Sequence, residues 1–454
     1  MISKILIANR GEIAVRIIRA CKEMLIDTVA VYSKADQDSL HVMLADETVC
    51  IGEAKAQDTY LNMNNLIQAA ISTNCDAIHP GFGFLSENPI FAKLVEDCGL
   101  IFIGPKPEII EQLGDKNQAR KLMKQANVPF VEGSKDIVET VEEGFSISLN
   151  IGYPVIIKAV NGGGGRGMRI CYSEDEFENN YNAAKAESLA CFNSDKVYIE
   201  KFIENPRHIE VQIIGDNFGN VIHLFERDCS FQRRNQKMIE EAPSTNLSEE
   251  LKNSLFEASV RACKFVGYNS VGTIEYLVSN NKFYFMEMNT RIQVEHPVSE
   301  MITNVDIIKE QIRVASNLKL SYKQEDIKCT GHAIECRINA EDVRNNFAPS
   351  PGKINFISIP GGNGIRVETN VYSGYVISPF YDSMILKLIA YAPTRLEALR
   401  KMRSALSELI IEGVNTNIEF HYYVMHQKDF VKAKYDTSLA GKIIKEIEND
   451  PNIV

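Results

Sequence analysis

Several patterns that would place this chain in a common class are missing from it. The ten cysteines are scattered without a CxxC or Cys/His spacing, which argues against a zinc or disulfide framework and favours buried free thiols in a reducing compartment. No apolar run approaches the about 20 residues that span a bilayer, and KILIA at residues 4–8 resembles a strand rather than a cleavable leader. The net charge of −11 argues against a general binder of nucleic acid or membrane surfaces. We therefore expect a soluble, cytoplasmic protein with no nucleic-acid or membrane partner.

The chain of 454 residues is too long for one ordinary core, and its patterning predicts several domains. Residues 1–113 alternate between helical patterns and short apolar strands, which predicts a doubly wound parallel sheet. A helical linker at 114–129, a small lid domain at 130–203 and a C-terminal mixed-sheet domain at 204–454 follow. The predicted fold class is therefore α/β in the first part and α+β in the rest. The apolar strands of the first part are expected at residues 4–8, 28–33, 76–80 and 100–105.

Two glycine-containing segments follow predicted strands of the N-terminal sheet. They are NRGEIA at residues 9–14 and HPGFGFLSEN at residues 79–88. Ligands bind at the carboxyl ends of the strands in such sheets. By position alone, these segments fit a ligand site and a simple turn equally well.

The run KAVNGGGGRGMRI at residues 158–170 predicts a phosphate-binding loop. Gly162, Gly164 and Gly167 satisfy GxGxxG, but MRICYS after them is strand-like, whereas a dinucleotide site needs a helix there. A P-loop is excluded because no GK[ST] is present. Consecutive glycines between two strands let backbone N–H groups close over phosphate oxygens, with Lys158 and Arg166 adding charge. The alternative is a flexible turn without function.

Two strand-like runs, TIEYLV at 273–278 and KFYFMEMN at 282–289, predict a hairpin around Asn280-Asn281. A loop centred on Asn281 places Glu275 opposite Glu287, and Asn289 shares their face. Like charges so placed need neutralisation, and two carboxylates with an amide oxygen suit Mg²⁺ or Mn²⁺. The alternative is a one-residue slip in register, which would send the two glutamates to opposite faces as solvated charges.

Beyond this hairpin, NTRIQVEHP would be too long for one reaction centre if it stayed extended, so we expect the chain to bend after Asn289. The bend would place Arg291 and Glu295 around a small anion, as a clamp and a general base. Each of the two could instead be a surface salt-bridge residue.

The polar segment ERDCSFQRRNQKMIEEAP at residues 226–243 has two interpretations. A run with this much charge is usually a solvated loop, and an oxyanion or phosphate site is the alternative. We expect Cys229 within it to be an inert thiol, because nothing next to it in sequence would act as its base.

These motifs together resemble the biotin carboxylase subunit of acetyl-CoA carboxylase, in the ATP-grasp superfamily. The resemblance covers nearly the whole chain in order, and it is most specific in RDCS.QRR.QK and MNTRIQVEHPV. It implies an ATP- and bicarbonate-dependent carboxylation of biotin N1′ through carboxyphosphate. The ATP-grasp fold, ATP, two Mg²⁺ or Mn²⁺ ions and biotin as a substrate on a carrier protein are therefore expected.

The resemblance also implies roles for individual residues. Those implied for ATP are Lys116, Lys158, Gly164, Gly165, the segment Glu200, Lys201, Phe202 and Ile203, His208, Asn235, Glu275 and Glu287. The implied metal ligands are Glu275, Glu287 and Asn289. The implied bicarbonate pocket comprises Lys237, Arg291, the Val294 backbone and Arg337, with Glu295 as the base and Arg337 stabilising the biotin enolate. Asn235 is a departure, because many family members have histidine there, and altered contacts with the nucleotide are expected.

Two missing segments favour one branch of this family. No lysine flanked by methionines, as in AMKM, marks a biotin-bearing domain, and no carboxyltransferase segment follows residue 454. We therefore expect a stand-alone subunit that is a homodimer and acts with a biotin carboxyl carrier protein and carboxyltransferase subunits. The acceptor could be acetyl-CoA, pyruvate or propionyl-CoA. The rival interpretations are another ATP-grasp carboxylate ligase and a nucleotide-sensing subunit without turnover.

Overall fold

The N-terminal region is built around a parallel sheet. The structure is a computed structural model that describes residues 2–134, 136–160 and 167–450. The elements here are β1 (Lys4–Ile7), α1 (Gly11–Glu23), β2 (Asp27–Tyr32), α2 (Leu40–Leu44), β3 (Glu47–Cys50), α3 (Met63–Ser72), β4 (Ala77–His79), α4 (Pro89–Asp97), β5 (Ile101–Phe102) and α5 (Pro107–Gly114). The strand order is β3-β2-β1-β4-β5, and every neighbouring pair is parallel, as predicted.

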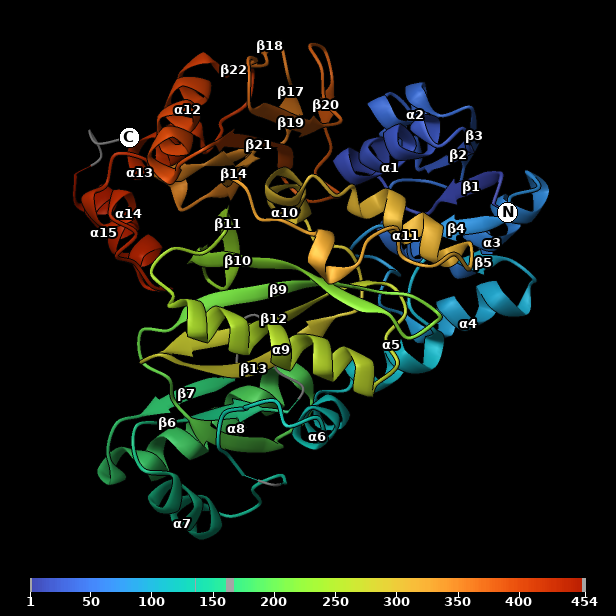
Figure 1. The fold of residues 1–454 in the computed structure, drawn as a ribbon. Coiled ribbons are helices and arrows are strands. Elements are labelled where there is room, and N and C mark those ends of the chain that lie inside the picture. The colour runs from blue at the N-terminus through green and yellow to red at the C-terminus, as the bar shows by residue number, and fades with distance from the viewer. Residues whose placement is uncertain (1, 135, 161–166, 451–454) are drawn as a thin grey trace.

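A small lobe follows the helix α6 (Lys116–Gln125), whose N-terminus is capped by the Asp115 side chain. It contains α7 (Val141–Ile151), β6 (Val155–Ala159), β7 (Met168–Cys171), α8 (Phe177–Phe192) and β8 (Val197–Lys201). The three strands form an antiparallel sheet in the order β7-β6-β8, with its own apolar core. The strand predicted after the glycine run is confirmed as β7. Figure 1 shows this lobe below the rest of the molecule.

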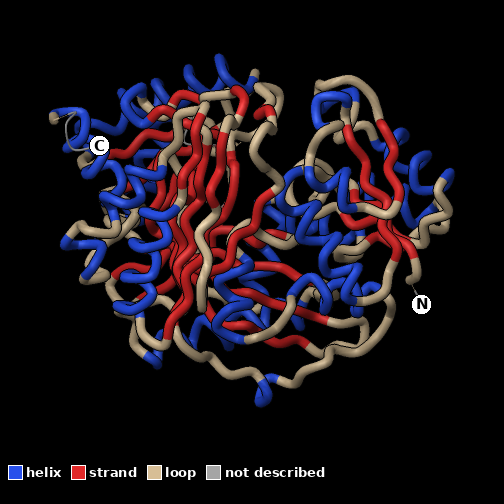
Figure 2. Tube along the Cα trace, turned by 90° about the horizontal axis from the view of Figure 1, so that it is seen from above, coloured by secondary structure: helices blue, strands red, loops and turns tan. Residues whose placement is uncertain are grey.

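An eight-stranded sheet forms the centre of the molecule. Its strands are β9 (Arg207–Gly215), β10 (Val221–Arg233), β11 (Gln236–Ala242), β12 (Val271–Ser279), β13 (Lys282–Asn289), β14 (His332–Asn339), β19 (Ile365–Thr369) and β21 (Met384–Ala392). They run in the order β13-β12-β9-β10-β11-β14-β21-β19, with antiparallel neighbours throughout. The helices α9 (Glu249–Phe265), α10 (His296–Thr303) and α11 (Ile307–Ala315) pack around it. Figure 2 shows these long strands side by side, apart from the N-terminal sheet.

The interpretation of residues 226–243 as a solvated loop is wrong. This segment is the β10–β11 hairpin, and most of its residues are buried. Its buried charged residues pair with groups from other parts of the chain, so the charge count alone gave a false indication of exposure. Arg227 is fully buried within it.

The C-terminal part completes the sheet and covers one end of it. Its further elements are β15 (Glu341–Asp342), β16 (Ala348–Pro349), β17 (Gly352–Lys353), β18 (Phe356–Ser358), β20 (Val376–Ile377), α12 (Arg395–Glu408), β22 (Ile410–Glu412), α13 (Ile418–Val424), α14 (Lys428–Val431) and α15 (Leu439–Asn449). Apolar side chains of β14, β21 and α12 make the largest core cluster. Among the residues described, no helix has both the length and the apolar character needed to cross a membrane.

Candidate active site

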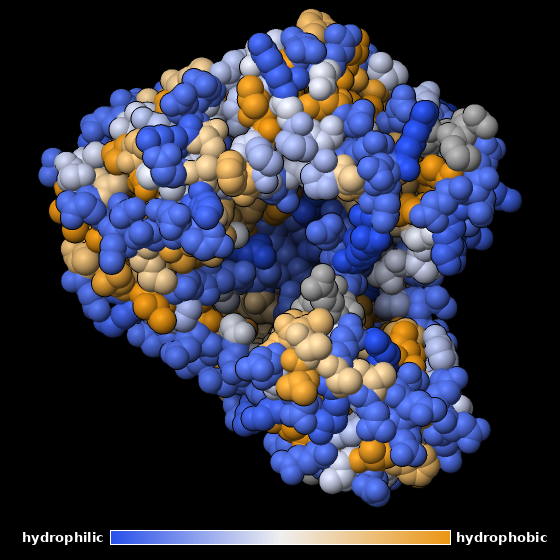
Figure 3. Space-filling view, turned by 180° about the vertical axis from the view of Figure 1, so that it is seen from behind, coloured by the Kyte–Doolittle hydropathy of each residue, from blue (hydrophilic) through white to orange (hydrophobic). Residues whose placement is uncertain are grey.

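One large cavity gathers most of the residues that the sequence singles out. It has a volume of about 1440 Å³ and lies between the small lobe, the N-terminal region and the eight-stranded sheet. Figure 3 shows its mouth as a hollow with mostly hydrophilic side chains. The predicted site residues that line it are Lys158, Glu200, Lys201, Phe202, Ile203, His208, Asn235, Lys237, Glu275, Glu287, Asn289, Arg291, Val294, Glu295 and Arg337. Gly164 and Gly165 lie outside the described residues, as does the side chain of Lys116, the first residue of α6.

The β12–β13 hairpin places Glu275 opposite Glu287, as predicted, but by a different route. Ser279 pairs with Lys282, so the turn is centred between Asn280 and Asn281 and not on Asn281. An extra residue, Met286, then bulges out of β13 and shifts the register by one. If Met286 instead took a regular place in the ladder, Glu275 would lie opposite Met286 and Glu287 would point to the other face of the sheet.

Glu275 is the buried member of the pair, and four side chains hold it. The Lys237 ammonium and the Asn289 amide each donate to Oε1 at 2.9 Å, and the Gln293 amide donates to it at 2.6 Å. His208 Nε2 lies 2.9 Å from Oε2. Burial alone would raise the pKa of Glu275, but Lys237 and His208 outweigh it and hold that pKa well below its usual range. The carboxylate is therefore ionised.

The chain bends after Asn289, as predicted, because β13 ends there and α10 begins at His296. Arg291 Nη2 donates to Asn289 Oδ1 at 2.8 Å, and Arg291 Nε donates to Glu87 Oε2 at 2.9 Å. Glu87 belongs to the segment at residues 79–88, so this segment contacts the site. Arg291 is partly buried at the cavity wall and is no isolated surface charge.

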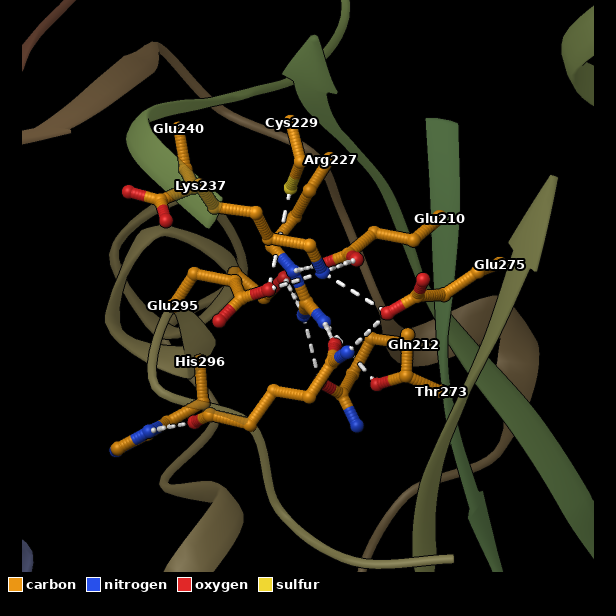
Figure 4. Close-up of polar contacts among 12 residues, drawn as sticks. Glu210, Gln212, Arg227, Cys229, Lys237, Glu240, Thr273, Glu275, Glu295 and His296 are labelled. Atoms are coloured by element: carbon orange, nitrogen blue, oxygen red, sulfur yellow. Dashed lines mark hydrogen bonds and ion pairs between the residues drawn. The ribbon is translucent and has the colours of Figure 1, made fainter. Parts of the chain in front are cut away.

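Lys237 lies at the centre of three buried carboxylates, as Figure 4 shows. Its ammonium is 2.5 Å from Glu210 Oε2, 2.9 Å from Glu275 Oε1 and 2.6 Å from Glu295 Oε1. Burial alone would lower the pKa of Lys237, but the three carboxylates raise it well above its usual value. A positive charge is thus fixed deep in the cavity beside Glu295.

Glu295 connects Lys237 to Arg337. Arg337 donates from Nη2 to Glu295 Oε2 at 2.9 Å and from Nε to Glu240 Oε1 at 2.6 Å. Burial would raise the pKa of Glu295, yet the Lys237, Arg337 and Arg227 charges lower it well below the usual range. Glu240 differs, because burial dominates there and raises its pKa to about 7. The pKa values of these two neighbouring carboxyl groups are therefore shifted in opposite directions.

The small lobe contributes a second charged group to the cavity. Lys158 on β6 lies 2.6 Å from Glu200 Oε2 on β8, and Arg120 on α6 pairs with the same carboxylate. The Lys201 ammonium donates to the carbonyls of Gly152 and Tyr153 at 2.9 Å, and Lys201 also lines the cavity.

Asn235 lies in the two-residue turn between β10 and β11. Both Arg234 and Asn235 have positive φ, 49° and 64°, the backbone of a tight hairpin turn. Asparagine tolerates that conformation better than most residues. Histidine shares this tolerance, so the backbone of the turn accommodates either residue and does not explain the departure at Asn235.

Comparison with known proteins identifies the family. A family model described as "Biotin carboxylase, N-terminal domain" matches residues 1–110, and "Biotin carboxylase C-terminal domain" matches residues 335–441. "Carbamoyl-phosphate synthase L chain, ATP binding domain" matches residues 115–323. The chain is 54% identical over 439 residues to biotin carboxylase 1 of Bacillus subtilis, covering 96% of this chain and 98% of that protein. This chain belongs to the biotin carboxylase family.

Other biotin carboxylases agree with this assignment. That of Haemophilus influenzae is 55% identical over 433 residues, covering 95% of this chain and 96% of its own. A solved Campylobacter jejuni biotin carboxylase–βγ-ATP complex has a TM-score of 0.92 and 47% identity, covering 97% of this chain and 99% of that one. The biotin carboxylase domain dimer of Hydrogenobacter thermophilus 2-oxoglutarate carboxylase, solved with MgADP, ADP and bicarbonate, has a TM-score of 0.91 and 50% identity, covering 100% and 98%. The ATP-grasp fold and the ligase class expected from the sequence are confirmed.

Sequence reasoning missed several buried carboxylate, cationic or amide side chains at or behind the cavity wall. They include Glu12, Glu210, Arg227, Glu240, Gln293, Glu335 and Lys387, all buried. A charged residue within a β-branched strand, such as Glu210 in HIEVQII, is the signal that could have indicated them.

Cys229 has a neighbour that the sequence did not suggest. Its Sγ lies 4.0 Å from Glu295 Oε1, so the statement that nothing could act as its base holds along the chain but is wrong in space. Burial nevertheless raises the pKa of the Cys229 thiol well above its usual value, with neighbouring carboxylates adding to the shift. The thiol is therefore protonated and unreactive, as expected. All ten cysteines are free.

Proposed function

We propose that this protein transfers a carboxyl group from bicarbonate to N1′ of biotin on a separate carrier protein, using ATP. The observation that carries this proposal is the arrangement of Lys237, Glu295 and Arg337 in one cavity with the acidic β12–β13 hairpin. It combines a fixed positive charge, an ionised base and a second cation next to possible metal ligands. An anion that must lose a proton and attack a phosphoryl group needs these groups together.

The small lobe is proposed as the lid over ATP. Its strands carry Lys158, and its glycine run, including Gly164 and Gly165, would close over the phosphates together with Lys116. The segment Glu200 to Ile203 joins the lobe to the central sheet, which suits a hinge that receives the adenine, with His208 and Asn235 at the nucleotide. We assign residues 1–113 to the N-terminal domain, 114–129 to the linker, 130–203 to the lid and 204–454 to the catalytic domain.

Glu275, Glu287 and Asn289 are proposed as the divalent-cation ligands. Their donor set fits, because hard carboxylate and amide oxygens are what Mg²⁺ and Mn²⁺ prefer, and Glu275 is ionised. Lys237 already places one cation beside Glu275, at 2.9 Å. When bound, two such ions would neutralise charge on the ATP phosphates.

Bicarbonate is proposed to lie between Lys237, Arg291 and the Val294 backbone. Glu295 takes its proton, because it is an ionised carboxylate that lines the cavity beside Lys237 and is held on both sides by cations. The deprotonated anion then attacks the γ-phosphate of ATP to give carboxyphosphate and ADP. Closure of the lid would shield carboxyphosphate from water.

Arg337 is proposed to stabilise the biotin enolate as N1′ is carboxylated. Its guanidinium is charged, partly buried and lines the cavity beside Glu295. A preorganised cation at the point where negative charge develops lowers the barrier of such a step. The orientation of Arg337 is fixed by its second bond to Glu240.

We propose further that the chain is a homodimer and works in the cytoplasm with a biotin carboxyl carrier protein and carboxyltransferase subunits. The dimer of the Hydrogenobacter domain supports the first point. Acetyl-CoA is our proposed acceptor, which would make this the first half-reaction of malonyl-CoA formation for fatty-acid synthesis. Similarity to biotin carboxylase parts of 2-oxoglutarate and pyruvate carboxylases keeps other acceptors, including propionyl-CoA, as alternatives.

Transfer of labelled bicarbonate to free biotin, with and without ATP, tests this function. We expect ATP-dependent label in biotin and stimulation of bicarbonate-dependent ADP release by biotin. ADP release that biotin leaves unchanged, with no label in biotin, would instead favour an ATP-grasp ligase for another carboxylate. ATP binding without turnover would favour a nucleotide-sensing subunit.

A further inference from the structure

Among the residues that the structure describes, Arg227 is the largest side chain that is completely buried, and it lies directly behind the cavity wall. It comes from β10, opposite Glu210 on β9. Figure 4 shows its guanidinium beneath Lys237, surrounded by polar side chains. Its five hydrogen bonds go to Glu210 Oε1 at 2.5 Å, Gln212 Oε1 at 2.6 Å, Ser299 Oγ at 3.0 Å, Thr273 Oγ1 at 3.0 Å and Gln293 Oε1 at 2.6 Å.

A guanidinium has five donors and no acceptor, so it determines which atom of each neighbour faces it. Glu210 uses Oε1 for Arg227 and turns Oε2 to the Lys237 ammonium, at 2.5 Å. Gln293 must turn its amide oxygen to Arg227, which leaves its NH₂ group on the other side. That group donates to Glu275 Oε1 at 2.6 Å.

We propose that Arg227 is a positioning residue that fixes the direction of the hydrogen bonds beneath the reaction centre. Through Glu210 it holds the Lys237 ammonium, and through Gln293 it holds the Glu275 carboxylate, although it lines no part of the cavity itself. This inference rests on the proposed function, in which Lys237 and Glu275 contact bicarbonate and the metal ions. Arg227 therefore acts on Lys237 and Glu275 indirectly, through Glu210 and Gln293.

The geometry requires an arginine at this point. A lysine has three donors and would leave at least two of the five acceptors unpaired. A neutral side chain would leave Glu210 without its partner at Oε1, with Lys237 at 2.5 Å and His208 Nε2 at 3.9 Å still beside Oε2. Lys237 is shared among three carboxylates, so a change at Glu210 alters its position relative to Glu275 and Glu295. Displacements of about 1 Å in such a site are enough to cost on the order of 10²-fold in rate.

Two of the five acceptors provide a matched comparison. Ser299 and Thr273 accept from Arg227 at 3.0 Å, but neither lines the cavity or contacts Lys237. Loss of the Ser299 hydroxyl removes one bond to Arg227 while Glu210 and Gln293 keep theirs. A purely structural role for Arg227 predicts that its bonds matter for stability alone, whereas the positioning role predicts that the bonds to Glu210 and Gln293 matter for kinetics.

The experiment compares Arg227→Lys, Arg227→Met and Ser299→Ala in the full chain. The unfolding temperature, the affinity for an ATP analogue, and the kcat and KM values for bicarbonate and ATP are measured for each variant. We expect Arg227→Lys to lower kcat/KM for bicarbonate at least about tenfold, with KM for ATP changed less than about threefold. Ser299→Ala should lower the unfolding temperature but keep kcat/KM for bicarbonate within about twofold of the parent. The proposal is overturned if a folded Arg227→Lys protein has the kinetics of the parent. It is also overturned if Ser299→Ala lowers kcat/KM for bicarbonate as much as Arg227→Lys does.

Glu210→Gln provides an independent variant of nearly the same shape, should the arginine variants not fold. With Arg227 present, the new amide must present its oxygen to the guanidinium and its NH₂ to Lys237, so two donors face each other. We expect a loss in kcat/KM for bicarbonate at least as large as that of Arg227→Lys, again with little change in ATP affinity. Parental kinetics in this variant would also overturn the proposal. Failure of the parent protein to carboxylate biotin would count against the proposed function, whereas these comparisons depend only on the bicarbonate-dependent ADP release of each variant relative to the parent.

Discussion

The Lys237 ammonium lies 2.6 Å from Glu295 Oε1 at the wall of the cavity, and both side chains are almost completely withdrawn from solvent. Their ion pair keeps Glu295 ionised despite complete burial, with Arg337 assisting from the other oxygen. A base that is held ready in this way should be needed for the proton transfer and not for nucleotide binding. This separation can be tested directly.

Glu295→Gln keeps the shape of the side chain but removes the base. We expect carboxylation of biotin to fall by about 10²–10⁴-fold, the usual range for a general base, while the affinity for ATP changes less than about threefold. Labelled-bicarbonate transfer and calorimetric nucleotide binding measure the two quantities. Glu257→Gln, at an exposed position of α9, is the matched control and should behave as the parent. Substantial carboxylation by Glu295→Gln would refute the assignment of the base.

Glu287→Gln should raise the metal requirement of the enzyme. Glu287 faces the cavity opposite Glu275, and loss of one carboxylate from a hard-oxygen donor set weakens Mg²⁺ binding. We expect the Mg²⁺ concentration for half-maximal activity to increase by about tenfold or more, with a fall in kcat at ordinary Mg²⁺. A titration of activity with Mg²⁺ and Mn²⁺ measures this. Glu249→Gln, whose side chain is 79% exposed, should leave the titration unchanged, and an equally unchanged titration for Glu287→Gln would exclude the site.

Lys387→Met should destabilise the fold and disturb the bicarbonate site. The fully buried Lys387 ammonium lies 3.1 Å from Glu12 and donates to the Val294 carbonyl at 2.8 Å, so it ties α1 to the loop before Glu295. Removal of one partner of a buried ion pair costs about 3–5 kcal/mol, which unfolding in urea measures. Lys93→Met, which breaks the exposed pair with Asp97, should leave the free energy of unfolding close to that of the parent. A loss for Lys387→Met no larger than this control would contradict the role.

Acid should destabilise the protein between about pH 6.5 and pH 4. Burial lowers the pKa of His41 to about 4, of His79 to about 3 and of His421 to about 4, below the about 6.5 of an unfolded histidine. The unfolded chain therefore binds more protons in this window, so its free energy falls relative to the folded state as the pH falls. Each pKa unit is worth about 1.4 kcal/mol.

Urea unfolding at several pH values measures that dependence. His421→Asn should flatten the curve in this window, whereas His426→Asn, at an exposed position, should leave its slope unchanged. The comparison isolates the histidine contribution from the general effect of carboxylate protonation. A parental slope in His421→Asn would show that this histidine is not the source.

The sequence predicted those parts of the fold and site that depend on local pattern. The strand after the glycine run, the parallel N-terminal sheet and the bend after Asn289 each follow from residue periodicity or reach, and all three are present. Glu275 and Glu287 were paired correctly, but the bulge at Met286 that makes this possible has no signature in the alternation of side chains. Strand periodicity gives a register only when the ladder is regular.

The parts that could not be predicted depend on contacts between distant segments. Arg227 belongs to a run whose charge suggested a solvated loop, and only the approach of β9, β12 and α10 turns it into a buried centre. Glu12 and Lys387 are far apart in the chain, so neither could be recognised as a partner of the other. Charge in a sequence indicates exposure only where no opposite charge can reach it in the fold.

The additional residue at Met286 makes the length of this hairpin as important as its composition. Insertion of a single residue between the turn and Glu287 would preserve both glutamates and every apolar side chain, yet with only one bulge it would turn one carboxylate to the far side of the sheet. Deletion of Met286, in contrast, would leave a regular ladder in which the two glutamates still face each other. Relatives and engineered variants that retain the two acids should therefore tolerate the loss of one residue here but not the gain of one. One extra residue at this place in an alignment would mark a protein that has lost the site while appearing to keep it.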